Sequence, residues 1–174
     1  MNREDCQYCQ LAKSKQDLTI YDDELMKAVL SPKPSVPGQI ELFPKKHFTI
    51  FEQVPDYETE KMFIMANKIS TAVFESLGMH GTNIIVNNGL GAGQLHPHFS
   101  IQIVPRKERD GLNLEWKQKQ VGEEEMSTVE LMLKPFAEAP AKSEEPKTVT
   151  VEKKHETIKD DSDNYLLRQL RRIP

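Results

Sequence analysis

The sequence lacks any long apolar segment. No run approaches the roughly 18 consecutive apolar residues that a membrane-spanning helix needs. The first ten residues also lack the apolar stretch after a basic one that marks a secretory signal. We therefore expect no membrane association and a cytoplasmic location.

The chain has a small net charge and few cysteines. The formal net charge is only -4, from 23 basic and 27 acidic side chains, so no general electrostatic attraction to nucleic acid or to an anionic membrane is expected. Any nucleotide must therefore be bound by local groups. In a reducing compartment the two cysteines, Cys6 and Cys9, favour a metal or redox site over a structural disulfide.

Short β-prone segments surround one long helical segment between residues 18 and 106. A core-facing helix is predicted over residues 57–77 by apolar side chains at steps of four, three and four, namely Met62, Ala66, Ile69 and Val73. Asp56 is a suitable N-cap and Gly78 a suitable stop. Strands are predicted over residues 19–21, 26–30, 39–43, 82–86 and 99–104. Strands, one helix and further strands predict an α+β fold.

The region after residue 106 changes character twice. A helix is predicted from Glu123 to Lys134, ended by Pro135, and we place the end of the domain, residues 1–136, just beyond it. Residues 138–163 contain eight acidic and five basic side chains and no aromatic one, so residues 137–163 are predicted to form a disordered acidic linker. Residues 164–174 regain leucines among arginines, which predicts a docking motif for a protein partner.

The spacing Cys6-x-x-Cys9 serves both zinc sites and dithiol redox sites. The redox use requires a preceding strand, and nothing before Cys6 can form one, so zinc is favoured. A tetrahedral site needs two more ligands, and the sequence offers five histidines: His47, His80, His96, His98 and His155. We interpret His80 as a loop residue and His155 as a solvated tail residue.

A row of polar side chains is predicted on one face of the strand that begins at His98. The two-residue period of a strand gives one side Phe99, Ile101 and Ile103, and the other His98, Ser100 and Gln102. A glycine-rich loop over residues 87–94 precedes this strand, and its backbone N–H groups are suited to hold a phosphate. An edge strand with one solvated face would show the same alternation.

The loop and the strand together resemble the signature of the histidine-triad (HIT) family. In that signature a Gly-Gln leads after three residues into His-x-His-x-His-x-x-Pro-Arg, and the chain follows this spacing without a gap from Gly93 to Arg106. Upstream segments agree in order and approximate spacing with zinc-containing members: Cys6-x-x-Cys9, residues 21–23, Pro37-Gly38, residues 44–47 and the long helix. The resemblance covers roughly residues 4–116.

Fold, metal and ligand expectations come with this resemblance. It implies a five-stranded antiparallel sheet with one long helix and a C-terminal helix, and a homodimer in which two sheets join. It implies a zinc ion held by Cys6, Cys9, His47 and His98. It also implies a bound nucleoside phosphate, with nucleotide-binding residues Ser31, Asn87, Gly93 and Gln94.

Two members of the triad are replaced in this chain. Family members attack the α-phosphate of a nucleotide with the second triad histidine, and the third contacts the phosphate; after His98, these positions are Ser100 and Gln102. A serine hydroxyl is a weak nucleophile without an adjacent base, and a neutral amide cannot supply acid chemistry. Gln39 also stands where many relatives carry a further histidine. Catalysis is therefore in question.

Two registers and two functions stay open at this point. His96-Pro97-His98 resembles the His-Pro-His of galactose-1-phosphate uridylyltransferases, and this register would make His98 the nucleophile after a two-residue slip. The first function is a nucleotide hydrolase or nucleotidyl transferase that uses His96 or His98. The second is a non-catalytic module that retains zinc and acts through its C-terminal motif.

Overall fold

The computed structural model describes residues 6–14 and 18–137. The chain divides into two compact units, Met1–Gly122 and Glu123–Pro174. The predicted docking motif, and the predicted linker beyond residue 137, lie outside the described residues. Among the residues described, no helix is both long and apolar enough to cross a membrane.

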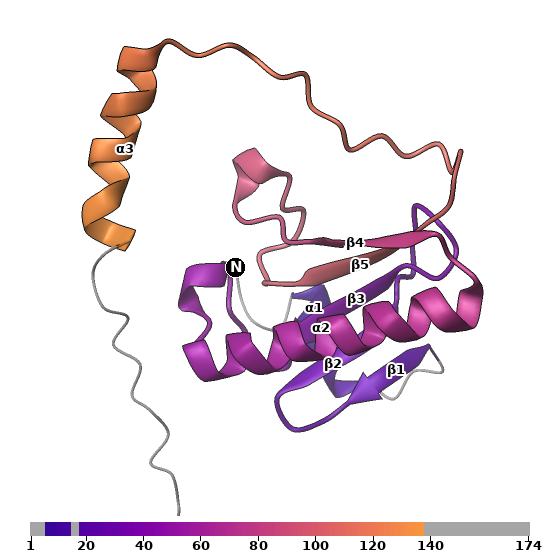
Figure 1. The fold of residues 1–174 in the computed structure, drawn as a ribbon. Helices are drawn as coiled ribbons and strands as arrows, with labels where there is room; N and C mark the ends of the chain where they lie inside the picture. The colour runs from indigo at the N-terminus through magenta and orange to yellow at the C-terminus, as the bar shows by residue number, and fades with distance from the viewer. Residues whose placement is uncertain (1–5, 15–17, 138–174) are drawn as a thin grey trace, which may run out of the picture. The chain divides into compact units, whose positions relative to one another are not determined.

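The first unit is built on a five-stranded antiparallel sheet (Figure 1). Its strands are β1 (Thr19–Asp22), β2 (Met26–Leu30), β3 (Ile40–Pro44), β4 (Gly81–Ile85) and β5 (Ile101–Arg106). Their order in the sheet is β1-β2-β3-β5-β4, so the last strand in the chain lies between β3 and β4. The predicted α+β class and the five-stranded sheet are confirmed. The insertion of β5 also sets Glu41 of β3 directly opposite Gln102 of β5.

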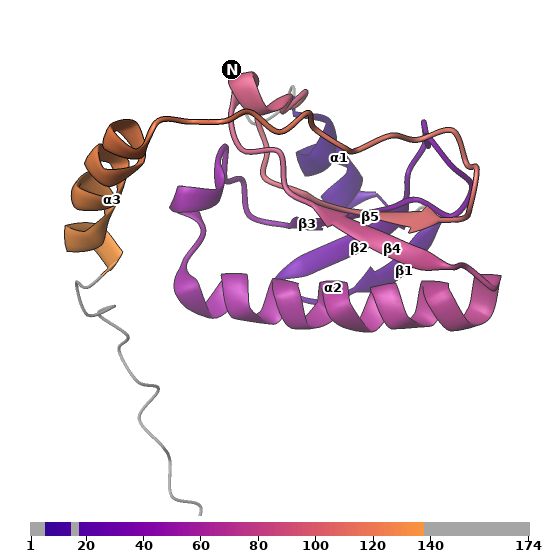
Figure 2. The same cartoon turned by 45° about the horizontal axis from the view of Figure 1, so that its top comes forward.

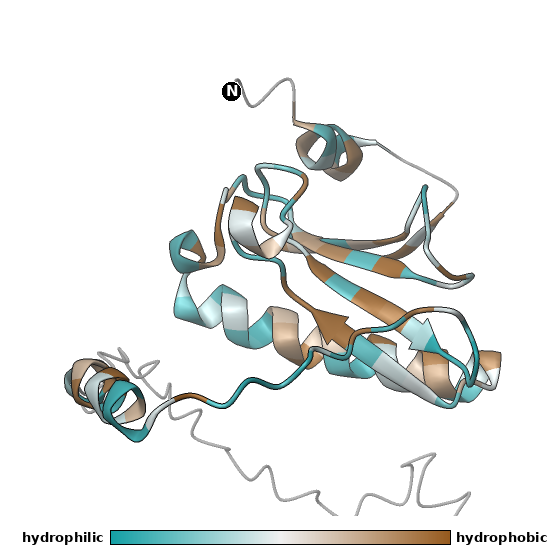
Figure 3. Cartoon of the chain, turned by 90° about the horizontal axis from the view of Figure 1, so that it is seen from above, coloured by the Kyte–Doolittle hydropathy of each residue, from teal (hydrophilic) through white to brown (hydrophobic). Residues whose placement is uncertain are grey.

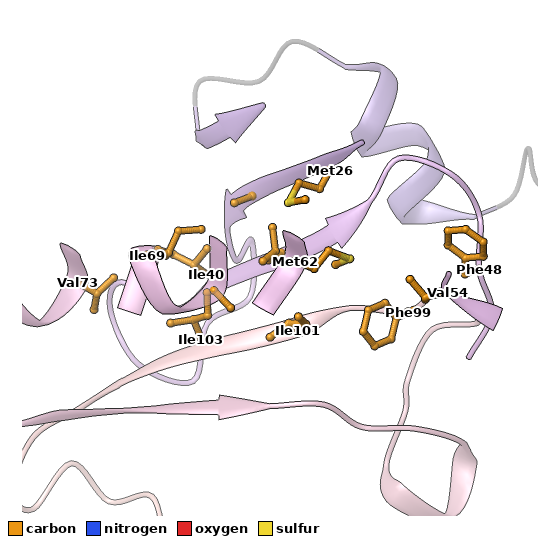
Figure 4. Close-up of a cluster of buried hydrophobic side chains, with 13 residues drawn as sticks. Met26, Ile40, Phe48, Val54, Met62, Ile69, Val73, Phe99, Ile101 and Ile103 are labelled. Carbon is orange, nitrogen blue, oxygen red and sulfur yellow. The ribbon is translucent and has the colours of Figure 1, made fainter. Parts of the chain in front are cut away.

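Helix α2 (Asp56–Leu77) covers one face of this sheet. The four residues of the predicted apolar stripe are all buried, and they pack with Ile101, Ile103 and Phe99 from the strand side (Figure 4). The helix ends as predicted at Gly78, which has a φ of 57° and therefore adopts the left-handed conformation that glycine tolerates best. The predicted N-cap is wrong by one residue, because Pro55 occupies that position and Asp56 is the first helical residue.

The opposite face of the sheet is covered by a short helix that the sequence did not predict. Helix α1 (Gln7–Lys13) lies across the sheet from α2 (Figure 2). Its buried residues Tyr8, Cys9 and Leu11 pack against Val29 and Phe43. Apolar and polar residues alternate along the strands (Figure 3), so successive side chains point alternately toward the α2 face and the α1 face of the sheet.

A buried lysine anchors the end of α1. Lys27 of β2 is 1% exposed, and its ammonium group donates hydrogen bonds to the carbonyl oxygens of Leu11 (3.0 Å) and Ser14 (2.5 Å). Its Nζ also lies 3.6 Å from a carboxylate oxygen of Asp22. Because the last carbonyls of a helix lack partners within the helix, a cation at this end stabilises it.

The remaining elements are short or separate. The 3-10 turn η2 (Phe51–Gln53) lies between β3 and α2, and η3 (Leu90–Ala92) lies between β4 and β5. Helix α3 (Glu123–Ala137) belongs to the second unit and contains Pro135. The predicted end of this helix before Pro135 is therefore wrong, because the helix continues to Ala137. The φ of proline is compatible with a helix, and its cost falls on the preceding turn, where the carbonyl of Leu131 loses its N–H partner.

Truncation after Ala137 is expected to leave the first unit folded. Among the residues that the structure describes, both buried clusters are made of residues between Cys6 and Ile103, so we expect this core to form without the removed segment. The melting temperature, followed by circular dichroism, should change by only a few degrees on truncation. As a comparison, Met62→Ala in the full chain should lower the free energy of unfolding by roughly 2–5 kcal/mol and the melting temperature by clearly more. Precipitation or a markedly lower melting temperature of the truncated chain would contradict the expectation.

Replacement of Lys27 by methionine is expected to destabilise the chain by roughly 1–3 kcal/mol, because two carbonyl groups at the end of α1 lose their donor. The matched control is Lys45→Met, which removes a partly exposed ion pair with the same Asp22 and should cost less than about 1 kcal/mol. Urea unfolding measures both. Equal losses in the two variants would refute a special role for the buried ammonium.

Candidate metal centre and adjoining cavity

Four side chains converge between α1 and the sheet. Cys6 immediately precedes α1, Cys9 lies in its first turn, His47 follows β3, and His98 lies just before β5. Their ligand atoms all lie within 4.8 Å of one another. The structure thus brings together the four residues that were predicted as metal ligands, from three separate segments of the chain.

The distances between donor atoms fit a tetrahedral ion. The Cys6 sulfur lies 3.4 Å from Nδ1 of His98, and the Cys9 sulfur lies 3.3 Å and 3.7 Å from Nδ1 of His47 and His98. Metal–sulfur bonds of about 2.3 Å and metal–nitrogen bonds of about 2.0 Å at tetrahedral angles give sulfur–nitrogen separations of about 3.5 Å. The cluster can therefore hold one metal ion with little rearrangement.

The second ring nitrogen of His98, Nε2, fixes the orientation of the imidazole relative to the cysteines. Nε2 lies 2.9 Å from the carbonyl oxygen of Pro44 and donates its hydrogen to it, which leaves the Nδ1 lone pair facing the two cysteines. Burial, together with the nearby His47, lowers the pKa of His98 to about 4, against the opposing effect of the Pro44 bond. The imidazole is therefore neutral near pH 7, as a metal ligand must be.

A cavity of about 440 Å³ adjoins this cluster on the α1 face of the sheet. It is lined by α1, by the segment before β3 and β3 itself, by β5, by the end of β4 and the loop over residues 87–96, and by residues 112 and 114. The predicted residues Asn87, Gly93 and Gln94 belong to this lining, as do Ser100 and Gln102. Ser31 is not part of the lining, but it contacts a residue that is.

That residue, Glu41, is part of a hydrogen-bonded row on the cavity wall. Ser31 donates its hydroxyl hydrogen to Glu41 at 2.6 Å, and the amide of Gln39 donates to the amide oxygen of Gln102 at 3.1 Å. The amide nitrogen of Gln102 in turn donates to the Ser100 hydroxyl at 3.3 Å. Ser100 and Gln102, the residues predicted at triad positions, are therefore bonded to each other, and Gln102 is also bonded to Gln39.

Tyr8 of α1 completes this row from the opposite side. Its ring centroid lies 4.8 Å from that of Phe43 and 5.4 Å from that of His98. Burial and the negative charge of Glu41 together raise the pKa of Tyr8 to about 12, against the opposing effect of hydrogen bonding with Ser100 and Gln102. The phenol is therefore neutral and provides no base.

Sequence reasoning missed Glu41 and Tyr8. The period of two that placed Ser100 and Gln102 on one face applies equally to the segment 39–43, where it places Gln39 and Glu41 on one face. The alternation could therefore have identified Glu41. No comparable pattern identifies Tyr8, because the helix that carries it was not predicted.

The glycine-rich loop uses its own polar groups. Backbone N–H groups inside the loop donate to other loop atoms at 2.8–3.2 Å, from Gly89, Ala92, Gly93 and Gln94. The side-chain amide of Gln94 donates to the carbonyl oxygens of Thr49 and His96. A phosphate held by this loop would have to replace these bonds, so the role predicted for the loop stays a prediction.

The two triad registers assign different roles to His98, a metal ligand in one and the nucleophile in the other. Nε2 of His98 donates to Pro44 and the lone pair of Nδ1 faces the cysteines, so no lone pair is directed at a substrate. His96 is exposed on the cavity lining and makes an edge contact with the Tyr8 ring at 5.6 Å. The geometry therefore opposes the register that makes His98 the nucleophile.

Fold and sequence comparisons agree on the class of protein. The sequence profile of the HIT domain matches residues 12–109, more than half of the chain, and the chain belongs to the HIT family. The adenylylsulfatase HINT3 of Arabidopsis thaliana is 34% identical over 109 residues, which cover 62% of this chain and 55% of that protein. The asymmetrical bis(5'-nucleosyl)-tetraphosphatase of Schizosaccharomyces pombe is 27% identical over 90 residues, 52% of this chain and 50% of that protein.

A solved structure also resembles the chain. The Zn-bound histidine triad family protein of Mycobacterium smegmatis has a TM-score of 0.59 and 25% identity, and the match covers 78% of this chain and 98% of that one. The chain thus spans most of this relative, but only about half the length of the two enzymes.

The purified chain is expected to contain one metal ion per molecule, because two thiolates and two imidazoles converge at bonding distances. Elemental analysis gives the stoichiometry. The double variant Cys6→Ser plus Cys9→Ser should fall to near zero and melt at a lower temperature, whereas His80→Ala, an exposed histidine outside the cluster, should retain the metal. Full retention of metal in the double variant would contradict the assignment.

Proposed function

We propose that this chain is a zinc-containing HIT protein whose cavity recognises a nucleoside moiety and which lacks the covalent nucleotidyl-transfer route of its family. The observation that carries the proposal is the bonded pair Ser100 and Gln102, which the resemblance to the family signature assigns to the positions of two catalytic imidazoles. The cavity beside this pair has room for a nucleoside-sized ligand. The hydrolase names of the plant and yeast relatives support nucleotide chemistry as the family background.

Zinc is the metal that best suits the cluster. Two thiolates with two imidazoles at tetrahedral spacing form a preferred donor set of Zn²⁺. Four protein ligands leave no position for water or substrate, so the ion is structural in this proposal. Its chemical contribution is to hold α1 against the sheet, and the Zn-bound relative from Mycobacterium smegmatis supports the assignment.

Among the described residues, Ser100 has no hydrogen-bond partner that can activate it. Its hydroxyl oxygen accepts a hydrogen bond from the Gln102 amide, which cannot take up a proton. The neighbouring Tyr8 phenol already holds its own proton, since its pKa is raised to about 12. A serine in these surroundings does not attack an α-phosphate at a useful rate.

The alternative is a hydrolase that uses His96. This histidine is the one imidazole of the described cavity lining that is not part of the metal cluster. Its exposed position on the lining would allow it to reach a bound phosphate. The experiment below separates the two functions.

Further parts of the proposal concern assembly and location. Helix α2 and strand β4 expose apolar side chains that are suited to a homodimer interface, namely Phe63, Ile64, Phe74, Leu77 and Ile84. We extend the proposal to a cytoplasmic location and to a protein partner for residues 164–174.

Wild-type chain is expected to show turnover of adenosine 5′-phosphoramidate at the detection limit, because removal of a covalent nucleophile costs up to roughly a millionfold in rate. The double variant Ser100→His plus Gln102→His should gain hydrolysis and a transient covalent adenylate. Release of AMP and intact-mass spectrometry provide the two readouts.

His96→Ala and His80→Ala are the companion variants. Robust wild-type turnover that His96→Ala abolishes, with metal content unchanged and His80→Ala fully active, would establish the hydrolase and refute the non-covalent proposal. A double variant that folds, binds metal and still forms no adenylate would show that the cavity has changed at more than two positions.

A further inference from the structure

The cavity carries very little positive charge for a site that would hold phosphate. Among the described residues that line it, Lys33 is the one lysine or arginine and Glu41 the one acidic residue. Lys33 lies in an exposed loop segment, whereas Glu41 is half-buried in a central strand. The charge fixed in the wall is therefore negative.

The Glu41 carboxylate is held in place by the sheet and by its neighbours. Strand β3 pairs with β2 on one side and with β5 on the other, so the backbone at Glu41 cannot shift. Ser31, itself 7% exposed, donates to the carboxylate at 2.6 Å, and the Tyr8 hydroxyl interacts with it from α1. The carboxylate cannot turn away from an incoming ligand without breaking these contacts.

A phosphate bound as the family resemblance implies would meet this carboxylate. The α-phosphate would lie at Ser100 and Gln102, and Gln102 is the residue directly opposite Glu41. Two like charges in a partly buried cavity repel more strongly than on an open surface, since less water and salt screen them. Four of the loop N–H groups that could offset the repulsion, those of Gly89, Ala92, Gly93 and Gln94, already donate to loop atoms.

We propose that Glu41 makes the cavity select nucleosides over nucleoside 5′-monophosphates, by placing a fixed carboxylate beside Ser100 and Gln102, where the family resemblance puts the α-phosphate. This inference rests on the proposed recognition of a nucleoside moiety and names the ligand class of that same cavity. The apolar side chains Ile85, Leu95 and Leu114 of the lining suit a base. The neutral hydroxyl and amide groups of Ser100, Gln39 and Gln102 suit a ribose.

The test compares two ligand pairs on three proteins. Isothermal titration calorimetry measures the Kd of adenosine against AMP, and of guanosine against GMP, on metal-loaded wild type, Glu41→Gln and Glu75→Gln. Glutamine keeps the size of the side chain and its acceptor for Ser31 but removes the charge. Glu75 is an exposed carboxylate on α2 and outside the cavity lining, so Glu75→Gln controls for the change in net charge.

Wild type is expected to bind at least one nucleoside about tenfold or more tightly than its monophosphate, as one like-charge contact in a partly screened cavity predicts. Glu41→Gln should narrow or reverse this ratio through tighter monophosphate binding. Glu75→Gln should leave the ratio unchanged. Higher salt should also narrow the ratio in wild type, since ions screen the repulsion.

Each other outcome overturns the inference in a distinguishable way. Tighter binding of monophosphate than of nucleoside by wild type, or an unchanged ratio in Glu41→Gln, refutes exclusion by Glu41 and leaves nucleoside recognition standing. Loss of nucleoside binding in folded, metal-loaded Glu41→Gln would make the carboxylate a ligand contact instead of a repulsive group. Binding of no ligand by any of the three proteins refutes the proposed function together with the inference.

Discussion

The geometry of the site depends on how His98 is held. One ring nitrogen points to Cys6 and Cys9 at the start of α1, and the other donates to Pro44 at the end of β3. A single imidazole therefore connects α1 to the sheet. This arrangement fixes the start of β5, and the alternation along that strand then sets Ser100 and Gln102 on the cavity wall. It also places α1 so that Tyr8 reaches the same row.

The polar residues of the cavity wall form two hydrogen-bonded groups that Tyr8 connects. Ser31 bonds to Glu41, and Gln39 bonds to Gln102, which in turn bonds to Ser100. The Tyr8 hydroxyl of α1 interacts with members of both groups. Because buried polar groups are costly when they lack partners, these residues depend on one another for their hydrogen bonds. The wall of the cavity is therefore coupled to the docking of α1.

Much of this fold could be predicted from sequence, because its strongest signals are periodic. The stripe at Met62, Ala66, Ile69 and Val73 gave the helix, and the alternation after His98 gave the face of β5 that carries the site. Cys6, Cys9, His47 and His98 came from a resemblance, since spacing alone does not show which histidines approach a pair of cysteines. Glu41 could have been found by the same alternation.

Other features had no signal in the sequence. Helix α1 has seven residues, too few for an apolar period, and its stability comes from contacts with Val29, Phe43 and Lys27 that lie far along the chain. The bonds inside the glycine-rich loop depend on backbone conformation, which composition does not specify. Pro135 is a local signal that misled, because proline weakens the preceding helical turn without preventing the helix from continuing to Ala137.

The sequence distance between the metal ligands has a consequence for how the chain acquires its structure. Cys6 and His98 meet across 92 residues, and the cavity wall pairs β3 with a strand that is made after β4. During synthesis the two thiols therefore emerge long before the histidine that completes their site, and they remain without it until nearly the whole sheet is present. Closure of so long a loop is slow and entropically costly, which makes the assembly of this centre a late event in folding.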